Sequence, residues 1–256
     1  MYNLSNQKTC PRVYKEIEPV FQSSINVLLE GENGVGKDYA ASLIYQKRNG
    51  KGELIIYDCE QTIRDQAQIV AQLTSPGFFQ KLRRSNHKDT LLIRRVDLLQ
   101  AHLLAQLSDF LEKLGERGGF SRKTLLHLGI IGSVEKREGI ELPNYDLLGK
   151  FLDYLFCFRI KIHPLRKRKE EIPWLIDKFL TMLNHELKRN VTGFATDALD
   201  ILLQYHWPNN LSELRAEIER DITLTRDNDL IKIPALSNRL IKCASPSHLL
   251  SRYNRT

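Results

Sequence analysis

The segment Gly31–Asp38, which reads G-E-N-G-V-G-K-D, determines the fold predicted for this chain. It follows a short apolar run, residues 25–29, and precedes a stretch, Asp38–Lys47, with a helical pattern. A strand, a glycine-rich turn and a helix in that order form the setting of a phosphate-binding loop. There, backbone N–H groups and the positive end of the helix surround an anion. The alternative is a purely structural turn. We expect the loop to bind nucleotide phosphates through Gly31, Glu32, Asn33, Gly34, Val35, Gly36, Lys37 and Asp38.

Composition leaves several kinds of partner open. The 256 residues suffice for one domain, or for one domain with a small satellite. No apolar run is long enough to cross a membrane and no signal-peptide pattern occurs, so we expect a cytoplasmic protein without a membrane partner. The net charge of +7 is compatible with a nucleic-acid or acidic partner, and equally with a solvated basic surface. The four scattered cysteines, none in a metal-binding spacing, are expected to be reduced and unliganded: Cys10, Cys59, Cys157 and Cys243.

Strand and helix patterns alternate through the first two thirds of the chain. The expected strands are residues 25–29, 53–57, 90–93, 125–131 and 154–162. Such alternation is typical of a parallel sheet with helices on both faces. After Pro164 the pattern contains helices at 170–187, 196–205 and 211–224, and no strand. We therefore predict an α/β domain over residues 1–165, an all-helical domain over 166–235 and a basic tail over 236–256.

Four segments resemble the AAA+ ATPase domain of bacterial enhancer-binding proteins, the sigma-54-dependent transcription activators. The loop is similar to G-E-x-G-T-G-K-E, including the acidic eighth residue. Residues 90–99, T-L-L-I-R-R-V-D-L-L, are similar to T-L-F-L-D-E-I-G-x-L. Residues 164–173 and 207–215, P-L-R-K-R-K-E-E-I-P and W-P-N-N-L-S-E-L-R, are similar to P-L-R-E-R-R-E-D-I-P and W-P-G-N-V-R-E-L-E. The resemblance implies an AAA+ core with a five-stranded parallel sheet between helices, a helical lid, and ATP or ADP as cofactor.

Several positions depart from the family pattern. The acids that hold magnesium and orient water fall on Arg94 and Arg95, and the residue that senses the γ-phosphate falls on Val134. The lid arginine falls on Ser212, and the inter-subunit arginines fall on Leu148 and Tyr154. The sigma-contacting sequence G-A-F-T-G-A is absent between residues 59 and 90, an interval that carries a basic run instead. These departures imply a degenerate member in which a homohexameric ring and activation of sigma-54 are disfavoured.

The two arginines determine the predicted chemistry. Hydrolysis of ATP requires magnesium and a carboxylate that orients water, whereas arginine repels the metal and cannot act as a base. Asp97 lies beyond the strand end, and Asp58 and Glu60 are expected at the sheet edge, away from the loop. We therefore expect weak magnesium binding or none, no metal site and no catalytic residue. Arg94 and Arg95 would join the loop in binding ATP or ADP.

Three functions remain open from the sequence. The first is a regulatory module that binds nucleotide and a protein partner, either another AAA+ protein or a transcription regulator. The second is a nucleic-acid-binding regulator that uses the basic stretch at 80–90 and the basic tail. The third and weakest is an active ATPase with displaced acids. In a further interpretation, the loop is a relic and the arginines pair with surface acids.

Overall fold

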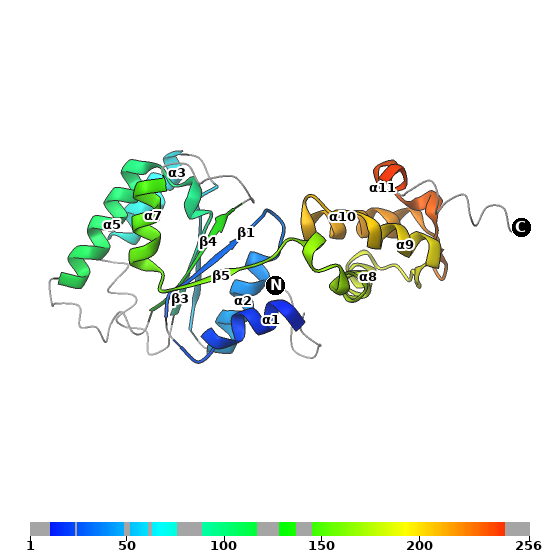
Figure 1. Cartoon of the computed structure of the whole chain (residues 1–256), viewed down its shortest axis with the longest axis horizontal. Coiled ribbons are helices and arrows are strands. Elements are labelled where there is room, and N and C mark those ends of the chain that lie inside the picture. Colours follow the sequence, from blue (N-terminus) through cyan, green and yellow to red (C-terminus); the bar gives the residue numbers. More distant parts are fainter. Residues whose placement is uncertain are drawn as a thin grey trace, which may run out of the picture. The chain divides into compact units, whose positions relative to one another are not determined.

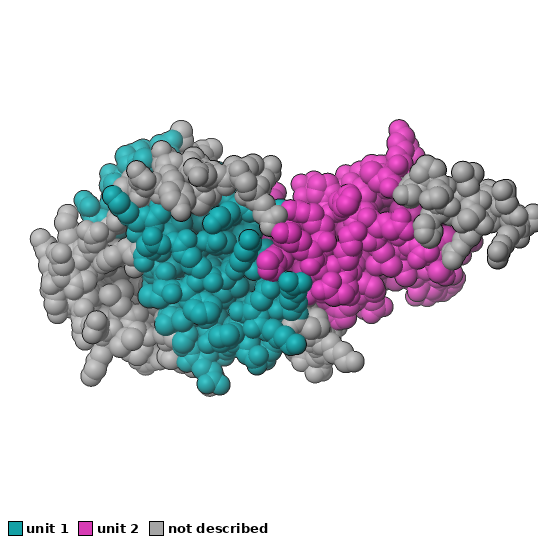
Figure 2. Space-filling view, in the orientation of Figure 1, with its two compact units in different colours: residues 1–32, 36–162 teal, residues 33–35, 163–256 magenta. Residues whose placement is uncertain are grey.

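The computed structural model describes residues 11–23, 25–48, 52–60, 63–75, 89–116, 128–136 and 145–243. The chain divides into two compact units (Figure 2). The first unit contains residues 1–32 and 36–162, and the second contains residues 33–35 and 163–256. Three residues of the glycine-rich loop therefore belong to the second unit, together with the helices that follow Pro164.

The first unit is built on a five-stranded parallel sheet in the order β2-β3-β4-β1-β5. Its strands are β1 (Val27–Gly31), β2 (Leu54–Asp58), β3 (Asp89–Arg94), β4 (Leu128–Glu135) and β5 (Phe158–Lys161). All residues of β1 are buried, as expected for a central parallel strand with helices on both faces, whereas edge strand β2 is only partly buried. This order places the carboxyl ends of β1, β3 and β4 at one edge of the sheet, beside the glycine-rich loop.

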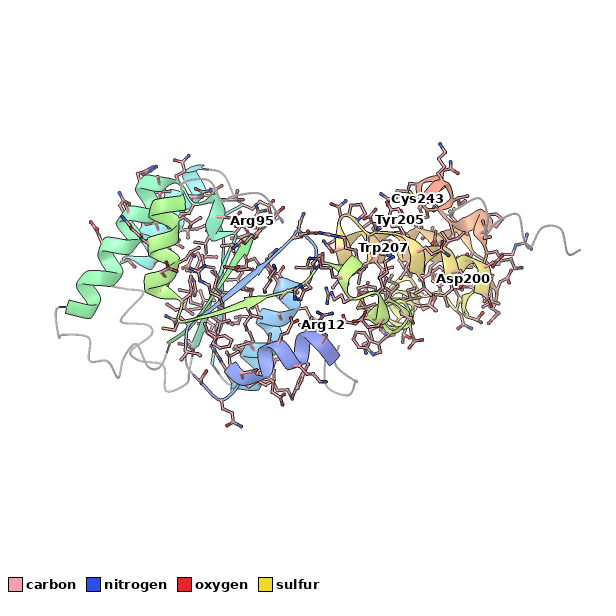
Figure 3. All side chains as sticks on the ribbon, viewed as in Figure 1. Arg12, Arg95, Asp200, Tyr205, Trp207 and Cys243 are labelled. Carbon is pink, nitrogen blue, oxygen red and sulfur yellow. The ribbon has the colours of Figure 1, made fainter. Side chains whose placement is uncertain are left out.

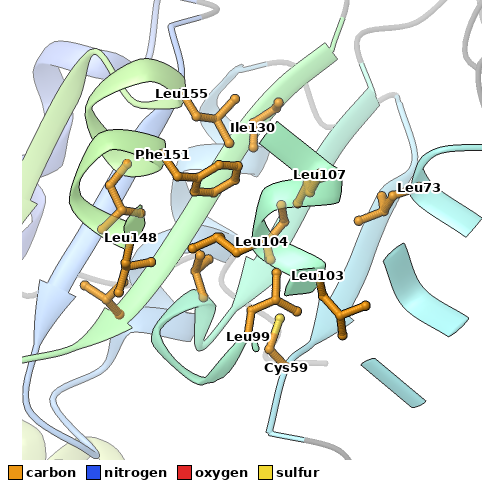
Figure 4. Close-up of a cluster of buried hydrophobic side chains, with 14 of the residues drawn as sticks. Cys59, Leu73, Leu99, Leu103, Leu104, Leu107, Ile130, Leu148, Phe151 and Leu155 are labelled. Atoms are coloured by element: carbon orange, nitrogen blue, oxygen red, sulfur yellow. The ribbon is translucent and has the colours of Figure 1, made fainter. Parts of the chain in front are cut away.

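Helices cover both faces of this sheet (Figure 1). α1 (Pro11–Ile17), which the 3-10 turn η1 (Glu18–Val20) follows, and α2 (Lys37–Arg48) lie on one face. α3 (Ile63–Leu73), α5 (Ala101–Glu116) and α7 (Tyr145–Leu155) lie on the other. Between that second layer and the sheet is a hydrophobic core to which all three helices contribute (Figure 4). Its members include Leu73, Leu104, Leu107, Ile130 and Phe151.

The second unit has a core of its own, formed by helices and short turns. The helices are α8 (Ile172–Leu187), α9 (Thr196–Gln204), α10 (Asn210–Leu224) and α11 (Asn238–Cys243). The 3-10 turns are η3 (Leu165–Lys167), η4 (Lys169–Glu171) and η5 (Ile233–Ala235). Trp207 is fully buried between α9 and α10, where its indole N–H donates to the carbonyl of Leu202 at 2.9 Å and its ring packs edge-on against Tyr205 (Figure 3). Trp207 is thus a packing residue of this core.

Two expected elements differ from those observed. The strand predicted at 154–162 starts only at Phe158, because residues 145–155 form α7. The buried residues of α7, Leu148, Phe151, Leu152 and Leu155, have helical spacing and pack in the core. The strand predicted at 125–131 is found at Leu128–Glu135, and residues 125–127 lie outside the described residues. The first shift arises because the apolar run continues from the end of α7 into β5, whereas β4 extends beyond its apolar run as far as Glu135.

The second unit is not all-helical. It contains a parallel pair of two-residue strands, β6 (Gly193–Phe194) and β7 (Leu230–Ile231), which lie on either side of α9 and α10 in the sequence. Part of the expected tail is also folded, since residues 238–243 form α11 and the side chains of Leu236 and Leu240 are buried. Residues 244–256 lie outside the described part of the chain.

Three carboxylates on α10, Glu213, Glu217 and Asp221, are buried at helical spacing. Arg239 of α11 pairs with Glu213 and Glu217. Burial, reinforced by the charge of Glu217, raises the pKa of Asp221 from 3.8 to about 7, although Arg220 opposes the shift. The folded protein therefore retains a proton on Asp221 that the unfolded chain has lost.

We predict that Asp221→Asn removes a pH dependence of stability. Because the folded-state pKa is the higher one, stability should decline as the pH rises from about 4 to about 7 and then level off. A difference of about three pKa units corresponds to roughly 4 kcal/mol at most. Urea unfolding at pH 5 and pH 8 measures the decline, which should be smaller in Asp221→Asn but unchanged in Glu219→Gln, an exposed neutralisation on the same helix. Equal declines in both variants would contradict the assignment.

Candidate nucleotide site

The glycine-rich loop begins where β1 ends and finishes where α2 starts. Gly36 has φ +99°, a conformation that side chains disfavour, so the turn into α2 requires glycine. The Lys37 ammonium donates to the carbonyls of Gly31 at 2.9 Å and Glu32 at 2.8 Å. Burial lowers the pKa of Lys37, and the carboxylate of Glu135 opposes that shift. In the first unit, the loop thus holds a half-buried cation at the start of a helix, where a phosphate would be stabilised.

The middle of the loop, residues 33–35, has its contacts within the second unit. Gly34 has φ +71°, and a Cβ added to it would lie 2.3 Å from the Asn209 carbonyl oxygen. The same Cβ would lie 2.9 Å from Oγ of Ser212, the residue at the position of the family's lid arginine. The small side chain at 212 therefore occupies the space beside Gly34 that a Cβ on that residue would enter. Gly34 is required both for its φ and for the absence of a Cβ.

Arg94 lies at the end of β3 and pairs with two carboxylates. Its Nε is 2.9 Å from Oδ1 of Asp38, and its Nη1 is 3.7 Å from Oδ2 of Asp58. The Asp38 side chain is 61% exposed, and the Arg94 and Asp58 side chains are each 31% exposed. Ion pairs with this much exposure contribute little stability, so Arg94 can exchange these partners for another anion.

Arg95 has a different environment, in a left-handed backbone conformation with φ +52° (Figure 3). Its Nη2 is 2.9 Å from Oδ2 of Asp97, and its Nη1 is 3.0 Å from Oε2 of Glu135. These carboxylates are only 6% and 13% exposed, and a third, Glu60, lies 3.7 Å away. Asp97 also accepts the N–H of Glu135 at 3.0 Å. Arg95 is therefore the centre of a largely buried ion cluster that connects the ends of β3 and β4.

The expectation that Asp58 and Glu60 lie away from the site was wrong. β2 is the edge strand, as expected, but it is hydrogen-bonded to β3 in a register that sets Asp58 opposite Arg94. Asp38 is consequently not the main acid that compensates the arginines. Five carboxylates lie near the cations Lys37, Arg94 and Arg95, and they come from residues 38, 58, 60, 97 and 135.

Sequence reasoning missed Glu135 as a member of this cluster. The available signal was its place at the end of a strand that lies between β1 and β3, because parallel strands bring their carboxyl ends to one edge. Val134, at the phosphate-sensing position, is fully buried. Leu148 packs in the core, and the side chain of Tyr154 is outside the described part of the structure. Of the basic stretch at 80–90, residues 80–88 lie outside the described part of the structure.

The described residues set limits on metal and membrane binding. Within them, no cluster of three or more His, Cys, Asp or Glu side chains has the placement that would hold a metal ion. Nor does any helix among them have the length and apolar character to span a membrane. Each of the five carboxylates near the loop is paired with an arginine.

Comparison with known proteins identifies the family. The sigma-54 interaction domain matches residues 4–73, and the AAA+ ATPase lid domain matches residues 166–251. The nitrogen fixation protein AnfA of Azotobacter vinelandii is 30% identical over 239 residues, which are 89% of this chain and 44% of AnfA. The chain belongs to the sigma-54 interaction domains of the AAA+ family. The resemblance stated from the four motifs is thereby confirmed.

This sigma-54 interaction domain spans half or less of the length of the curated relatives it matches. The transcriptional regulatory protein XylR of Pseudomonas putida is 26% identical over 250 residues, which cover 92% of this chain and 43% of XylR. Among solved structures, NtrX from Brucella abortus in complex with ATP has a TM-score of 0.70 at 19% identity, covering 100% of this chain and 61% of NtrX. NtrX in complex with ADP has a TM-score of 0.69 at 18% identity, covering 97% of this chain and 59% of NtrX. These structures confirm the AAA+ fold, with its parallel sheet and lid.

Proposed function

We propose that this sigma-54 interaction domain binds ATP or ADP without hydrolysing it, and that it acts as a regulatory binding module. The observation that carries the proposal is the pairing of Arg94 and Arg95 with the acids around them. Its partner would be another AAA+ protein or a transcription regulator, since relatives such as XylR and RocR of Bacillus subtilis are regulators of transcription. The complexes of NtrX with ATP and ADP support nucleotide as the ligand of the loop.

The loop residues fit a nucleotide. Gly34 and Gly36 have the positive φ values of an anion-binding turn, and Lys37 adds a fixed ammonium. Arg94 supplies a partly exposed guanidinium that can bind a phosphate in a bidentate manner. The phosphates of a bound nucleotide would place further negative charge beside Lys37 and Arg94, in addition to the carboxylates that already surround these cations. Magnesium does not fit the same site, because the carboxylates that would hold it pair with the arginines.

Hydrolysis lacks a suitable base. Asp97 and Glu135 are the least exposed acids of the cluster, and Arg95 contacts both of them. A carboxylate held in an ion pair with a guanidinium is a poor proton acceptor. For the alternative of an ATPase with displaced acids, Asp97 and Glu135 are therefore the candidate bases. The positive charge of Arg95 opposes proton transfer to either of them. The reading as a nucleic-acid-binding protein rests on residues 80–88 and 244–256, which the structure does not describe.

Calorimetric titration with ATP and ADP, in excess magnesium and again in a chelator, tests the proposal. We expect affinities that differ by less than about threefold between the two conditions, because Arg94 replaces the metal. We also expect no turnover in a phosphate-release assay, against typical enzyme rates of about 1 to 1,000 per second. Lys37→Ala is the control and should abolish binding.

Three results would overturn parts of this proposal. Loss of affinity in the chelator would show that the site needs magnesium after all. Turnover that Lys37→Ala abolishes would establish the active-ATPase reading. Absence of binding at millimolar nucleotide would reduce the domain to an interaction module with a relic loop.

A pull-down from the source cell, with and without nucleotide, then tests the partner. DNA binding that weakens steeply with salt would favour the nucleic-acid reading instead.

A further inference from the structure

Three consecutive carbonyl groups of the loop accept hydrogen bonds inside the second unit. The Asn33 carbonyl accepts from the side-chain amide of Asn210 at 2.8 Å, and the Gly34 carbonyl accepts from the N–H of Leu211 at 2.9 Å. The Val35 carbonyl accepts from Nη2 of Arg168 at 2.7 Å. Arg168 lies between η3 and η4, and Asn210 and Leu211 are the first two residues of α10. Each peptide plane in this part of the loop is therefore fixed by its own donor.

Fixing the carbonyls also fixes the N–H groups, because the two groups of one peptide point in opposite directions. Within the described residues, the N–H groups of Gly34, Val35 and Gly36 donate no hydrogen bond, while the carbonyls of residues 33–35 each accept one. Successive backbone N–H groups without a protein acceptor are what an anion-binding turn offers. The three hydrogen bonds thus keep the loop open for an anion.

Arg168 and Asn210 are built into the second unit for this contact. Arg168 is 1% exposed, and its other amino group pairs with the buried carboxylate of Glu171 at 3.1 Å. Asn210 is fully buried, and its side-chain oxygen accepts the N–H of Leu165 at 2.8 Å while its amide donates to Asn33. A left-handed backbone at Asn210, with φ +53°, aims that side chain. A buried arginine whose guanidinium spans a carboxylate and a loop carbonyl is a specific arrangement, because burying a charge is unfavourable unless its partners are in place.

We propose that Arg168 and Asn210 are positioning residues for phosphate binding, which hold residues 33–35 in the anion-binding conformation before a nucleotide arrives. This inference rests on the proposed function, because it assigns these residues a role at the same loop. Neither residue needs to touch the nucleotide. They act through the orientation of the loop peptides, so their loss should weaken binding of ATP and ADP equally, whether or not magnesium is present.

Arg168→Lys is the informative variant, because it keeps the buried positive charge beside Glu171 but removes the planar fork that reaches both partners. The matched control is Arg215→Lys, which makes the same change at an exposed pair with Glu186 on the same unit. The first measurement is the NMR order parameter of the Gly34, Val35 and Gly36 amides without nucleotide. The second is the affinity for ATP by calorimetry, and the third is the thermal unfolding midpoint.

We expect the three amides to be rigid in the parent protein, with order parameters near 0.85, and to fall below about 0.6 in Arg168→Lys. ATP affinity should fall about tenfold, the effect of losing one charge-assisted hydrogen bond, and Arg215→Lys should change neither quantity. If the parent protein binds no nucleotide, the proposed function fails, and the order parameters still decide this inference.

Unchanged order parameters and affinity in Arg168→Lys would overturn the proposal. So would a loss of order that extends equally through α8 and α10, since that outcome would mean that Arg168 only stabilises the unit. Where Arg168→Lys does not fold, the double variant Arg168→Met, Glu171→Met replaces it, because removing both charges leaves neither of them buried without a partner. Loop amides that lose order in a stably folded double variant support the proposal, and amides that stay rigid overturn it.

Discussion

Asp38→Asn is expected to tighten ATP binding about tenfold in the absence of magnesium. In a site that depends on a metal, removing an acid beside the phosphates would weaken binding or leave it unchanged. Here Asp38 pairs with Arg94 at 2.9 Å and competes with the incoming phosphates for that guanidinium. Its own negative charge also repels the nucleotide. For charges about 6 Å apart at an effective dielectric of about 40, removing that repulsion is worth about 1.4 kcal/mol, a factor of about ten.

The control for Asp38→Asn is Asp153→Asn, which removes an exposed acid that pairs with Arg159 in the same unit. Both variants raise the net charge by one, so a general electrostatic attraction of nucleotide would appear equally in both. Calorimetry at low and moderate salt separates a local effect from a general one, since distant exposed charges are screened beyond about 10 Å at 0.1 M salt. Weaker binding in Asp38→Asn would show that Arg94 does not take the place of the metal.

The parts of the fold that follow from local pattern were predictable from the sequence. β1 and the glycine-rich loop are contiguous, and each central strand is an apolar run that needs only its own residues to be recognised. The boundary between α7 and β5 was not predictable in this way. The segment Tyr154–Ile162 is apolar except for Arg159 and Lys161, although residues 154–155 end a helix and residue 158 starts a strand. The two-residue strands β6 and β7 are too short to leave a periodic signal, and they form only because the second unit brings them together.

The candidate site depended on pairings between distant residues, which no local pattern contains. That Asp58 lies opposite Arg94 follows from the register of β2 on β3, and that Glu135 reaches Arg95 follows from the position of β4. The sequence predicted two adjacent arginines in equivalent roles. Their environments differ because Arg94 ends β3 whereas Arg95 follows the strand in a left-handed backbone conformation, so that Arg94 pairs with an exposed aspartate and Arg95 with two largely buried acids. The contact of Arg168 with Val35 joins residues 133 positions apart.

Arg95→Met is expected to destabilise the first unit more than any other single substitution in the ion cluster. Asp97 and Glu135 would remain 6% and 13% exposed in the parent geometry without their main cation. Removing one partner of a buried ion pair typically destabilises a protein by about 3–5 kcal/mol. Total unfolding free energies are about 5–15 kcal/mol, so this loss should be visible as a large shift of the urea midpoint. By contrast, Arg94→Met should cost about 0–1 kcal/mol, because its partner Asp38 is 61% exposed.

The two adjacent variants should therefore separate stability from binding. Arg94→Met should fold normally and lose affinity for nucleotide in the chelator. Arg95→Lys keeps a positive charge beside Asp97 and Glu135, so it should recover much of the stability that is lost in Arg95→Met. Urea unfolding and calorimetry on the three variants give both quantities. Equal destabilisation by Arg94→Met and Arg95→Met would show that burial of the acids is not what distinguishes the arginines. Loss of binding only in the Arg95 variants would reassign the phosphate contact from Arg94 to Arg95.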